Sequence, residues 1–404
     1  MMSGWKVEKL GDVCEKIQDG SHFSPQKTYS EKKPDRYLYI TSKNIRNEYM
    51  DLSNISYVDK EFHQSIYQRC NPEFGDVLLT KDGVNTGNIT LNTLDEPFSL
   101  LSSVCLIKTN RQKLLPSFLK YYIQSPDGFK NITGQMTGMA IKRIVLHRIK
   151  SAKIPIPPLP EQQRIVAVLD EAFASIAQAK ANAERNLVNA RELFDLTLQN
   201  FLVKAGKQWG IKSLGDVCEK VEYGSSAKSQ PSGTVPVLRM GNVQNGVFDW
   251  TNLVYTSDKD EIKKYLLKHN DVLFNRTNSP ELVGKTAIYK SEMPAIFAGY
   301  LIRIHRKEDL LDADYLNYFL NSDIAMKYGK TVFISSVNQA NINGQKLKSY
   351  PIPLPPLAEQ RAIVGRLEAL SAETGRLEAV YRQKVAALEE LKKSVLQRAF
   401  AGGI

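Results

Sequence analysis

Pro157-Pro158-Leu159-Pro160-Glu161-Gln162 returns 198 residues later as Pro355-Pro356-Leu357-Ala358-Glu359-Gln360. After each copy the chain has no proline and is rich in strong helix formers, from residue 161 to about 204 and from 359 to about 400. Proline is tolerated in the first turn of a helix, where its missing N–H is not needed. Both hexapeptides therefore predict the start of a long helix.

Apolar residues recur along both predicted helices at helical spacing. Two ladders, from residue 165 to 201 and from 363 to 399, each make ten steps in 36 residues, or 3.6 residues per step. This is the repeat of a straight α-helix. Thr374 and Lys392 interrupt the second ladder. The residues predicted to carry the packing between the helices are Ile165, Leu169, Ile176, Leu187, Phe194, Ile363, Leu367, Leu377, Leu388 and Val395.

A helix of about 44 residues is about 65 Å long, and helix propensity alone does not stabilise it in water. Its apolar stripe has to pack against something. The equal length and register of the two stripes favour packing of the helices against each other. In a duplicated chain they are then antiparallel, each starting at its own globular domain, with the domains at opposite ends. The alternative is that each helix folds back on its own domain.

A second repeat marks the start of each half of the chain. The segment from Trp5 to Ile17 returns 204 residues later as Trp209 to Val221, and both copies contain Leu-Gly-Asp-Val-Cys-Glu-Lys. Between the two kinds of repeat, short apolar runs predict strands and longer amphipathic segments predict short helices. The clearest strands are 37–40, 76–79, 104–107, 237–238, 271–274 and 301–304, and the clearest helices are 116–124 and 313–321.

These patterns predict an α+β fold with a pseudo-two-fold internal repeat. Two similar mixed domains are separated by two long antiparallel helices in a coiled-coil-like spacer. The expected division of the chain is 1–157 and 206–355 for the domains, and 158–205 and 356–404 for the helices.

The composition indicates a polyanionic partner. The chain has 404 residues and a formal net charge of +11, which favours nucleic acid over an acidic protein. A moderately basic protein without any nucleic-acid role is the alternative. The four cysteines form no Cys-x-x-Cys pair, and no apolar run reaches the ~18 residues that span a bilayer. We expect a cytoplasmic protein with no membrane partner.

Two segments resemble catalytic motifs without completing them. Asn71-Pro72-Glu73-Phe74 is close to the Asn-Pro-Pro-aromatic motif of DNA amino-methyltransferases, but Glu73 replaces the second proline. Val283-Gly284-Lys285-Thr286 imitates the end of a P-loop, but Ser279 stands where the first glycine is required. The five histidines have no metal-ligand spacing. We therefore expect the first segment to be a turn, and we expect no catalytic residue and no metal site.

Polar loops recur at equivalent places of the two halves but carry different side chains. Arg, Lys, Asn and Gln read base edges, whereas Lys, Ser and Thr hold phosphates. Polar loop residues are also common without any DNA role. The candidate DNA contacts are Ser42, Lys43, Asn44, Lys81, Asn85, Gln135, Thr137, Lys142 and Arg143 in the first half, and Ser226, Lys228, Arg239, Asn242, Arg276, Asn278, Lys285, Asn338 and Gln339 in the second.

Taken together, the two Leu-Gly-Asp-Val segments, the two Pro-Pro-Leu-x-Glu-Gln segments and the ending Leu396-Gln397-Arg398-Ala399-Phe400 resemble the specificity subunit of type I restriction-modification systems. The resemblance covers nearly the whole chain. It implies two target-recognition domains, each reading one half of a bipartite, asymmetric site in double-stranded DNA. Thr374 and Lys392 depart from an apolar stripe, which puts in doubt how tightly the second helix packs.

The resemblance also implies partners. The helices are expected to space the domains and to dock two methyltransferase subunits, and restriction subunits that translocate DNA join them in phage defence. The chain itself is expected to be non-catalytic and to bind no cofactor, with S-adenosylmethionine, ATP and Mg²⁺ on the partner subunits.

Two other functions remain open at this level. A stand-alone DNA-modifying enzyme would methylate DNA as the purified chain with S-adenosylmethionine. A structural coiled-coil adaptor with protein-binding domains would bind a protein without sensitivity to salt and would have no affinity for DNA.

Overall fold

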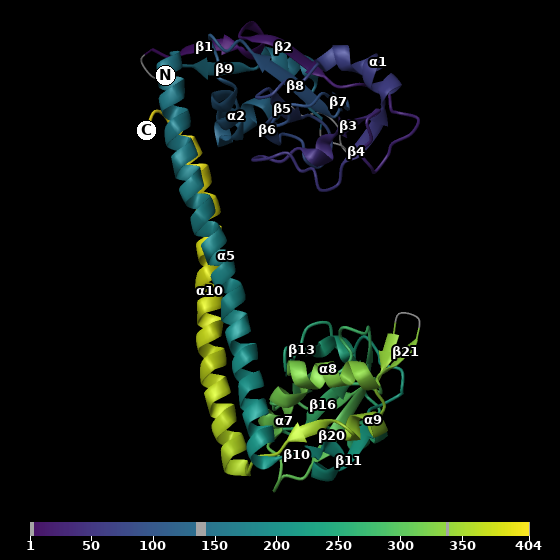
Figure 1. The fold of residues 1–404 in the computed structure, drawn as a ribbon. Coiled ribbons are helices and arrows are strands. Elements are labelled where there is room, and N and C mark those ends of the chain that lie inside the picture. Colours follow the sequence, from purple (N-terminus) through teal and green to yellow (C-terminus); the bar gives the residue numbers. More distant parts are fainter. Residues whose placement is uncertain (1–3, 135–142, 337–338, 404) are drawn as a thin grey trace. The chain divides into compact units, whose positions relative to one another are not determined.

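The structure is a computed structural model that describes residues 4–134, 143–336 and 339–403. It contains two compact units: the first comprises Met1–Ala183 and Gln383–Ile404, and the second comprises Glu184–Arg382. The predicted α+β fold with an internal repeat is confirmed, because both units contain the same kind of mixed domain and parts of both long helices (Figure 1). The finer division of the chain at 157, 205 and 355 stays a prediction.

The domain of the first unit contains two small sheets. Strands of the first sheet are antiparallel in the order β2-β8-β5-β6, and the second has the order β4-β3-β7 with β3 and β7 parallel. Its elements are β1 (Lys6–Lys9), β2 (Cys14–Asp19), β3 (Arg36–Ile40), β4 (Ser56–Asp59), α1 (Lys60–Cys70), β5 (Val77–Thr80), β6 (Ile89–Leu91), β7 (Phe98–Leu100), β8 (Val104–Thr109), α2 (Pro116–Gln124), α3 (Pro126–Thr133), α4 (Leu146–Ser151) and β9 (Lys153–Ile156).

The domain of the second unit repeats this layout. The corresponding sheets have the orders β11-β20-β16-β18 and β15-β12-β19, again with one parallel pair, β12 with β19. Its elements are β10 (Ile211–Ser213), β11 (Cys218–Tyr223), β12 (Val235–Leu238), β13 (Val243–Gln244), β14 (Val247–Phe248), β15 (Val254–Thr256), α6 (Lys259–Tyr265), β16 (Val272–Asn275), β17 (Thr277–Asn278), β18 (Thr286–Ile288), β19 (Ile296–Phe297), β20 (Leu301–Arg306), α7 (Ala313–Leu320), α8 (Asp323–Val332), β21 (Ile334–Ser336), β22 (Gln339–Asn341), α9 (Gly344–Lys348) and β23 (Pro351–Pro353).

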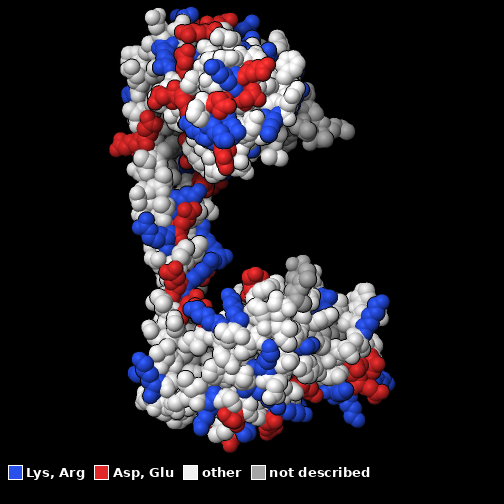
Figure 2. Space-filling model, turned by 45° about the vertical axis from the view of Figure 1, so that its right-hand side comes forward, with Lys and Arg blue, Asp and Glu red and all other residues white. Residues whose placement is uncertain are grey.

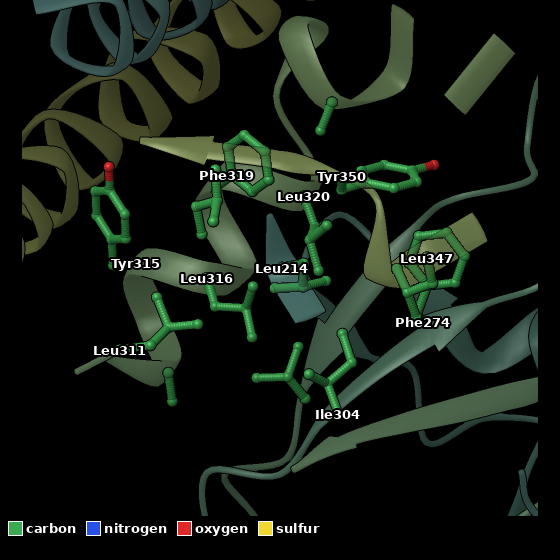
Figure 3. Close-up of a cluster of buried hydrophobic side chains, with 14 of the residues drawn as sticks. Leu214, Phe274, Ile304, Leu311, Tyr315, Leu316, Phe319, Leu320, Leu347 and Tyr350 are labelled. Carbon is green, nitrogen blue, oxygen red and sulfur yellow. The ribbon is translucent and has the colours of Figure 1, made fainter. Parts of the chain in front are cut away.

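The repeated Leu-Gly-Asp-Val segment is a buried anchor in both domains. It forms a 3-10 turn, Leu10–Asp12 in the first unit and Leu214–Val217 in the second, and both leucines are buried. In the second unit Leu214 packs in the main core with Phe274, Ile304 and Leu347 (Figure 3). The sequence identity between the halves therefore marks core positions.

Two long helices complete the units: α5 (Leu159–Trp209) and α10 (Leu357–Ala401). In the first unit Ile165 and Leu169 of α5 share a buried cluster with Leu396 and Ala399 of α10. In the second unit Leu198 and Leu202 of α5 share one with Ile363, Val364 and Leu367 of α10. The helices therefore pack against each other and are antiparallel, as predicted, and the same clusters also tie their ends to the adjacent domain.

The predicted packing residues differ in burial along the stripe. Those near the domains (Ile165, Leu169, Ile363 and Leu367) are fully buried, whereas the remaining six (Ile176, Leu187, Phe194, Leu377, Leu388 and Val395) are half-buried. Away from the domains, ion pairs accompany the apolar contacts: Lys180 with Glu389 in the first unit, and Arg191 with Glu378 at 3.3 Å in the second.

The first helix ends about five residues later than expected. It continues past Gly206 to Trp209, and Gly210 ends it with a left-handed backbone at φ +85°. Gly402, at φ +88°, ends α10 in the same way. Glycine has no Cβ to oppose a positive φ, so it is the usual residue at this position.

The two polar interruptions of the second stripe are accommodated. The hydroxyl of the buried Thr374 donates to the carbonyl oxygen of Leu370, at 2.9 Å within its own helix. The ammonium of Lys392 lies 5.1 Å from the ring centroid of Phe173 and pairs with Glu48. Neither residue leaves an unpaired polar group in the helix pair.

The glutamine of the repeated hexapeptide fastens each long helix to its domain. Gln162 is fully buried; its Oε1 accepts from the N–H of Leu115 at 2.9 Å, and its Nε2 donates to the carbonyl of Lys113 at 2.8 Å. Gln360 makes the same contacts with Asp312 and Leu310, both at 2.8 Å. Because both ends of the amide are used, no shorter or apolar side chain replaces this contact.

Candidate nucleic-acid interface

A pair of strand ends occupies the same place in both domains. In the first unit Gly20, after β2, and Lys81, after β5, donate their backbone N–H groups to Val104 and Ser103. In the second unit Gly224 and Arg276 donate to Leu301 and Tyr300. The two backbones are thus matched residue by residue, and the side chains beside them differ.

The glycines after β2 and β11 are required by close backbone approach. A Cβ on Gly20 would lie 2.2 Å from the carbonyl oxygen of Leu100, and one on Gly224 would lie 2.3 Å from that of Phe297. No other residue fits either position. The residue just before, Asp19 or Tyr223, is therefore held at a constant place in each domain.

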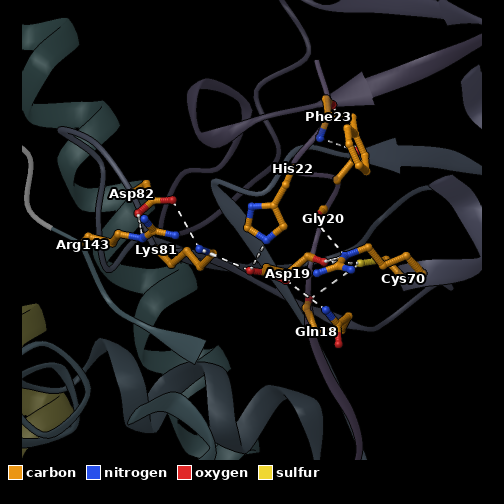
Figure 4. A network of polar contacts seen from close by, with 11 residues as sticks. Gln18, Asp19, Gly20, His22, Phe23, Cys70, Lys81, Asp82 and Arg143 are labelled. Atoms are coloured by element: carbon orange, nitrogen blue, oxygen red, sulfur yellow. Dashed lines mark hydrogen bonds and ion pairs between the residues drawn. The ribbon is translucent and has the colours of Figure 1, made fainter. Parts of the chain in front are cut away.

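In the first unit this place holds a cluster of charges (Figure 4). The buried Asp19 carboxylate pairs with Arg69 at 2.8 Å, with His22 at 3.1 Å and with Lys81 at 3.5 Å. Lys81 is 1% exposed and also lies 3.4 Å from Asp82. Its ammonium is therefore engaged inside the domain and not presented at the surface.

Opposing effects act on the pKa of Asp19. Burial by itself would raise this pKa, but the hydrogen bond from Arg69 and the charges of Lys81 and His22 outweigh burial and lower it below its usual value. The carboxylate is therefore charged across the physiological range, and it organises the surrounding cations.

Two cations of the cluster are exposed, Arg69 beside Asp19 and Arg143 beside Asp82. The Nε of Arg143 lies 3.2 Å from Asp82 Oδ1, and half of its side chain is exposed. A bridge pairs Arg143 with Asp82, as β17 and β22 pair Asn341 with Thr277 in the second unit. Arg143 and Asn341 are thus equivalent positions.

In the second unit an aromatic ring replaces the acid. The guanidinium of Arg276 lies 4.9 Å from the ring centroid of Tyr223. Its Nη2 donates to Asn341 Oδ1 at 3.4 Å and its Nη1 to the carbonyl of Gly299 at 3.5 Å. Tyr223 is fixed in turn, because its hydroxyl accepts from the N–H of Gly344 at 2.7 Å.

Two candidate asparagines have an internal role. Asn44 and Asn242 are buried at equivalent positions, where each Oδ1 accepts from the N–H three residues earlier and each Nδ2 donates to a carbonyl seven residues later. These contacts close the same loop in both domains. Base reading by these two residues stays a prediction, and the structure accounts for them without it.

The other candidates of the first unit lie around the same loop. Ser42 is half-buried, and its carbonyl accepts from Asn85 Nδ2 at 3.2 Å, whereas Lys43 is exposed. Gln135, Thr137 and Lys142 lie outside the residues that the structure describes.

In the second unit Ser226, Lys228, Arg239 and Gln339 are exposed, and Asn278 is half-buried at the end of β17. Lys285 is separate from this group. It lines a cavity of about 620 Å³ with residues of α5, α7 and α10, including Phe194 and Tyr318. Asn338 lies outside the described residues.

The charged side chains form no continuous basic belt on the face in view. On both units of Figure 2, Lys and Arg side chains are interspersed with Asp, Glu and uncharged residues.

Neither a metal cluster nor a membrane span is found among the described residues. No group of three His, Cys, Asp or Glu side chains among them is placed to hold a metal ion. Within the same residues, no helix has the length and apolarity that a membrane span needs. Asn71 ends α1 with a left-handed backbone at φ 40°, and a turn follows in which the N–H of Asp76 donates to the carbonyl of Glu73 at 3.1 Å.

Asp19 and Tyr223 are not among the residues predicted from sequence. A signal existed, because both precede a Gly-Ser pair at the repeat distance of 204 residues. A search for Arg, Lys and Asn in loops overlooks an acid and an aromatic residue at strand ends.

Comparison with known proteins agrees with this architecture. The family model described as "Type I restriction modification DNA specificity domain" matches residues 2–185 and again 206–386. The EcoKI specificity subunit of Escherichia coli K12, a type I restriction enzyme subunit, is 25% identical over 99% of this chain and 89% of its own length. The putative MjaX specificity subunit of Methanocaldococcus jannaschii is 29% identical over 49% of this chain and 47% of its own.

Two solved structures share the fold. One, from work on complex assembly and conformational transition of the type I R-M system, aligns over 100% of this chain and 99% of its own with a TM-score of 0.78. The HsdS subunit of Thermoanaerobacter tengcongensis aligns over 100% and 98% with a TM-score of 0.62. Both are 20% identical to this chain, so they bear on fold alone.

Proposed function

Because the chain belongs to the type I restriction-modification DNA specificity family, we propose that it reads a bipartite, asymmetric DNA site, one half with each of its two similar domains. It is a DNA-recognition subunit and not the catalytic part of such a system. The observation that supports two separate readings is the matched pair of strand ends. At the same backbone positions, one unit has an exposed Arg143 beside the buried Asp19 and Lys81, and the other has Tyr223, Arg276 and Asn341.

Different side chains on one backbone frame are suited to different base sequences. Hydrogen bonds to base edges carry sequence information, whereas phosphate contacts only position a protein. Two domains with identical side chains at this place would favour a symmetric site. The different accessible side chains at this place, Arg143 in one domain and Tyr223 with Arg276 in the other, therefore support an asymmetric one.

Proteins of a type I restriction-modification system are the expected partners. In finer detail, we propose that two methyltransferase subunits dock on the long helices and that restriction subunits join them. An exposed apolar stripe on α5 supports a protein partner there. Val188, Leu196 and Val203 fall within an arc of about 80° on the helix, away from the buried Ala190 and Leu198.

The chemistry then belongs to the partners. S-adenosylmethionine would be bound by the methyltransferase subunits, and ATP and Mg²⁺ by the restriction subunits, on chromosomal DNA in the cytoplasm. The support for this assignment is that the relatives are specificity subunits.

Mapping of methylated bases tests this proposal. A host lacking other modification systems is given this gene with its adjacent methyltransferase gene, and its DNA is sequenced by a single-molecule method that detects methylated bases. We expect one bipartite motif, with methylation only when both genes are present. Methylation by the purified chain with S-adenosylmethionine, or a motif unchanged when this gene is removed, would contradict it.

A further inference from the structure

We infer that Arg276, held on the ring of Tyr223, reads a guanine in the half-site of the second unit. This inference rests on the proposed function, since it names one base contact within it. The inference names Arg276 as the residue that contacts the base, Tyr223 as the ring that orients it, and guanine as the base selected.

The first observation is that the guanidinium is oriented by neighbours that do not neutralise it. It contacts the Tyr223 ring, Asn341 Oδ1 and the carbonyl of Gly299. Its Nε is buried without a hydrogen-bond partner among the described residues, and no carboxylate of that part of the chain lies within ion-pair distance. The charge of Arg276 is therefore available to a ligand.

Arg303 of the same sheet shows the contrasting arrangement. It is buried, and its guanidinium pairs with Glu222 at 2.6 Å and with Asp271 at 3.0 Å. Arg303 is thus a structural cation whose charge is matched by acids. Arg276 has the same planar donors without any acid to match them.

The second observation is the surface position of the support. Tyr223 is 42% exposed and Arg276 is half-buried, so the stacked pair lies at the edge of the domain. The hydroxyl of Tyr223 is held by the N–H of Gly344, which limits rotation of the ring. A guanidinium stacked on a fixed ring loses little conformational entropy when it binds.

The chemistry of the free donors selects the base. Nη1 and Nη2 each carry a second N–H besides the one used inside the domain, and two parallel N–H groups of an arginine match the O6 and N7 acceptors of guanine in the major groove. Adenine presents a donor at the position of O6, so it is disfavoured. A good bidentate contact of this kind discriminates against the wrong base by about 5- to 150-fold.

The first unit cannot use the equivalent residue in the same way. Lys81 is buried between Asp19 and Asp82, and the exposed cations there are Arg69, paired with Asp19, and Arg143, paired with Asp82. Both exposed arginines of the first unit's cluster thus have an acid partner, whereas Arg276 has none among the described residues. This difference predicts that the first unit reads its half-site with a residue other than Lys81, the equivalent of Arg276.

Four variants test the reading of guanine by methylation mapping of the assembled methyltransferase in a host. With the wild-type chain, the half-site of the second unit contains a required guanine. Arg276→Ala relaxes that one position and leaves the other half-site unchanged. Arg276→Gln favours adenine there, because glutamine pairs with N6 and N7 of adenine. Arg276→Lys keeps the charge and stem but loses the paired donors, so it also relaxes this position. Lys263→Ala, which removes an exposed cation on α6 of the same domain, leaves the motif unchanged.

The outcomes separate this inference from the proposed function. A wild-type chain that yields no bipartite motif rejects the proposed function itself. A normal wild-type motif that stays the same in Arg276→Lys and Arg276→Gln rejects only the role of Arg276. If Arg276→Ala abolishes all methylation, the Lys variant decides: relaxation at one guanine supports the inference, and uniform weakening of every position shows a phosphate contact instead.

Discussion

Asp19 makes the free energy of unfolding of the first unit depend on pH. Burial opposes ionisation, but Arg69, Lys81 and His22 together hold the pKa of this carboxyl below its usual value. A carboxyl whose pKa is lower in the folded state than in the unfolded state, where it is about 3.9, stabilises the fold at any pH above the unfolded value. This stabilisation is lost as the pH falls through the lower pKa of the folded state.

We predict that Asp19→Asn lowers the free energy of unfolding near pH 7 by about 1–3 kcal/mol, because it removes a charged acceptor from a buried cluster. The difference from wild type should shrink below about pH 4. Urea unfolding of the first unit between about pH 2.5 and 7 measures this, with the exposed Asp35→Asn as the control. A difference that persists unchanged at the acidic end would show that the charge of Asp19 is not the cause.

The buried glutamines of the repeated hexapeptide are the second residue-scale case. We predict that Gln162→Ala and Gln360→Ala each lower the free energy of unfolding by about 1–3 kcal/mol, since each leaves a backbone N–H and carbonyl groups unpaired inside the domain. The neighbouring exposed Gln163→Ala is the matched control. The melting temperature of each variant measures this effect. Equal decreases for Gln163→Ala and Gln162→Ala would show that Gln162 does not fasten the helix to its domain.

At the scale of elements, the helix pair is strongest where it meets a domain. Leu367 is fully buried against α5 and the core of the second unit, whereas Leu193 on α5 is largely exposed. We predict that Leu367→Ala costs about 2–5 kcal/mol of unfolding free energy. Leu193→Ala should stay within about 0.5 kcal/mol of wild type. Denaturant titration checks both, and comparable losses would mean that the stripe was assigned to the wrong face.

Much of the element order was predictable from sequence because the signals are periodic or repeated. The helix at 116–124 is confirmed at Pro116–Gln124, and the apolar ladders identify the faces of α5 and α10 that pack together. The end of α5 was not predictable, because Gly206 and Gly210 both resemble helix stops and only the backbone shows which one turns.

The site was predictable only in part, since loop composition does not show which way a polar side chain points. Asn44 and Asn242 look like exposed readers in sequence but close their own loops. Lys81 is drawn inward by Asp19, whose influence depends on strands brought together by the fold. Arg276 was found, whereas its support Tyr223 is an aromatic residue and not a polar loop residue.

At the scale of the whole molecule, we predict that the paired helices set the number of unread base pairs between the half-sites. Inserting four helix-forming residues after Ala183 adds about 6 Å and rotates the remainder of α5 by about 40°. One or two base pairs add about 3–7 Å and 35–70° to duplex DNA. The unread gap should therefore lengthen by one or two base pairs, and both half-sites should keep their sequences.

The control for this insertion replaces four exposed residues of α5 with the same helix formers, so that the length is unchanged. Its methylated motif should equal that of the wild-type chain. A gap that stays constant in the insertion variant while a half-site sequence changes would mean that the helices are not the spacer.

Exchanging one domain tests most directly whether each domain reads its own half of the DNA site. Residues 12–150 are replaced by the equivalent segment of a relative with a known but different motif, and methylated sites are mapped in a host that carries the methyltransferase gene. We predict that one half of the recognised sequence becomes that of the relative while the other half is unchanged. A motif in which both halves change, from a chimaera that still supports methylation, would contradict separate reading.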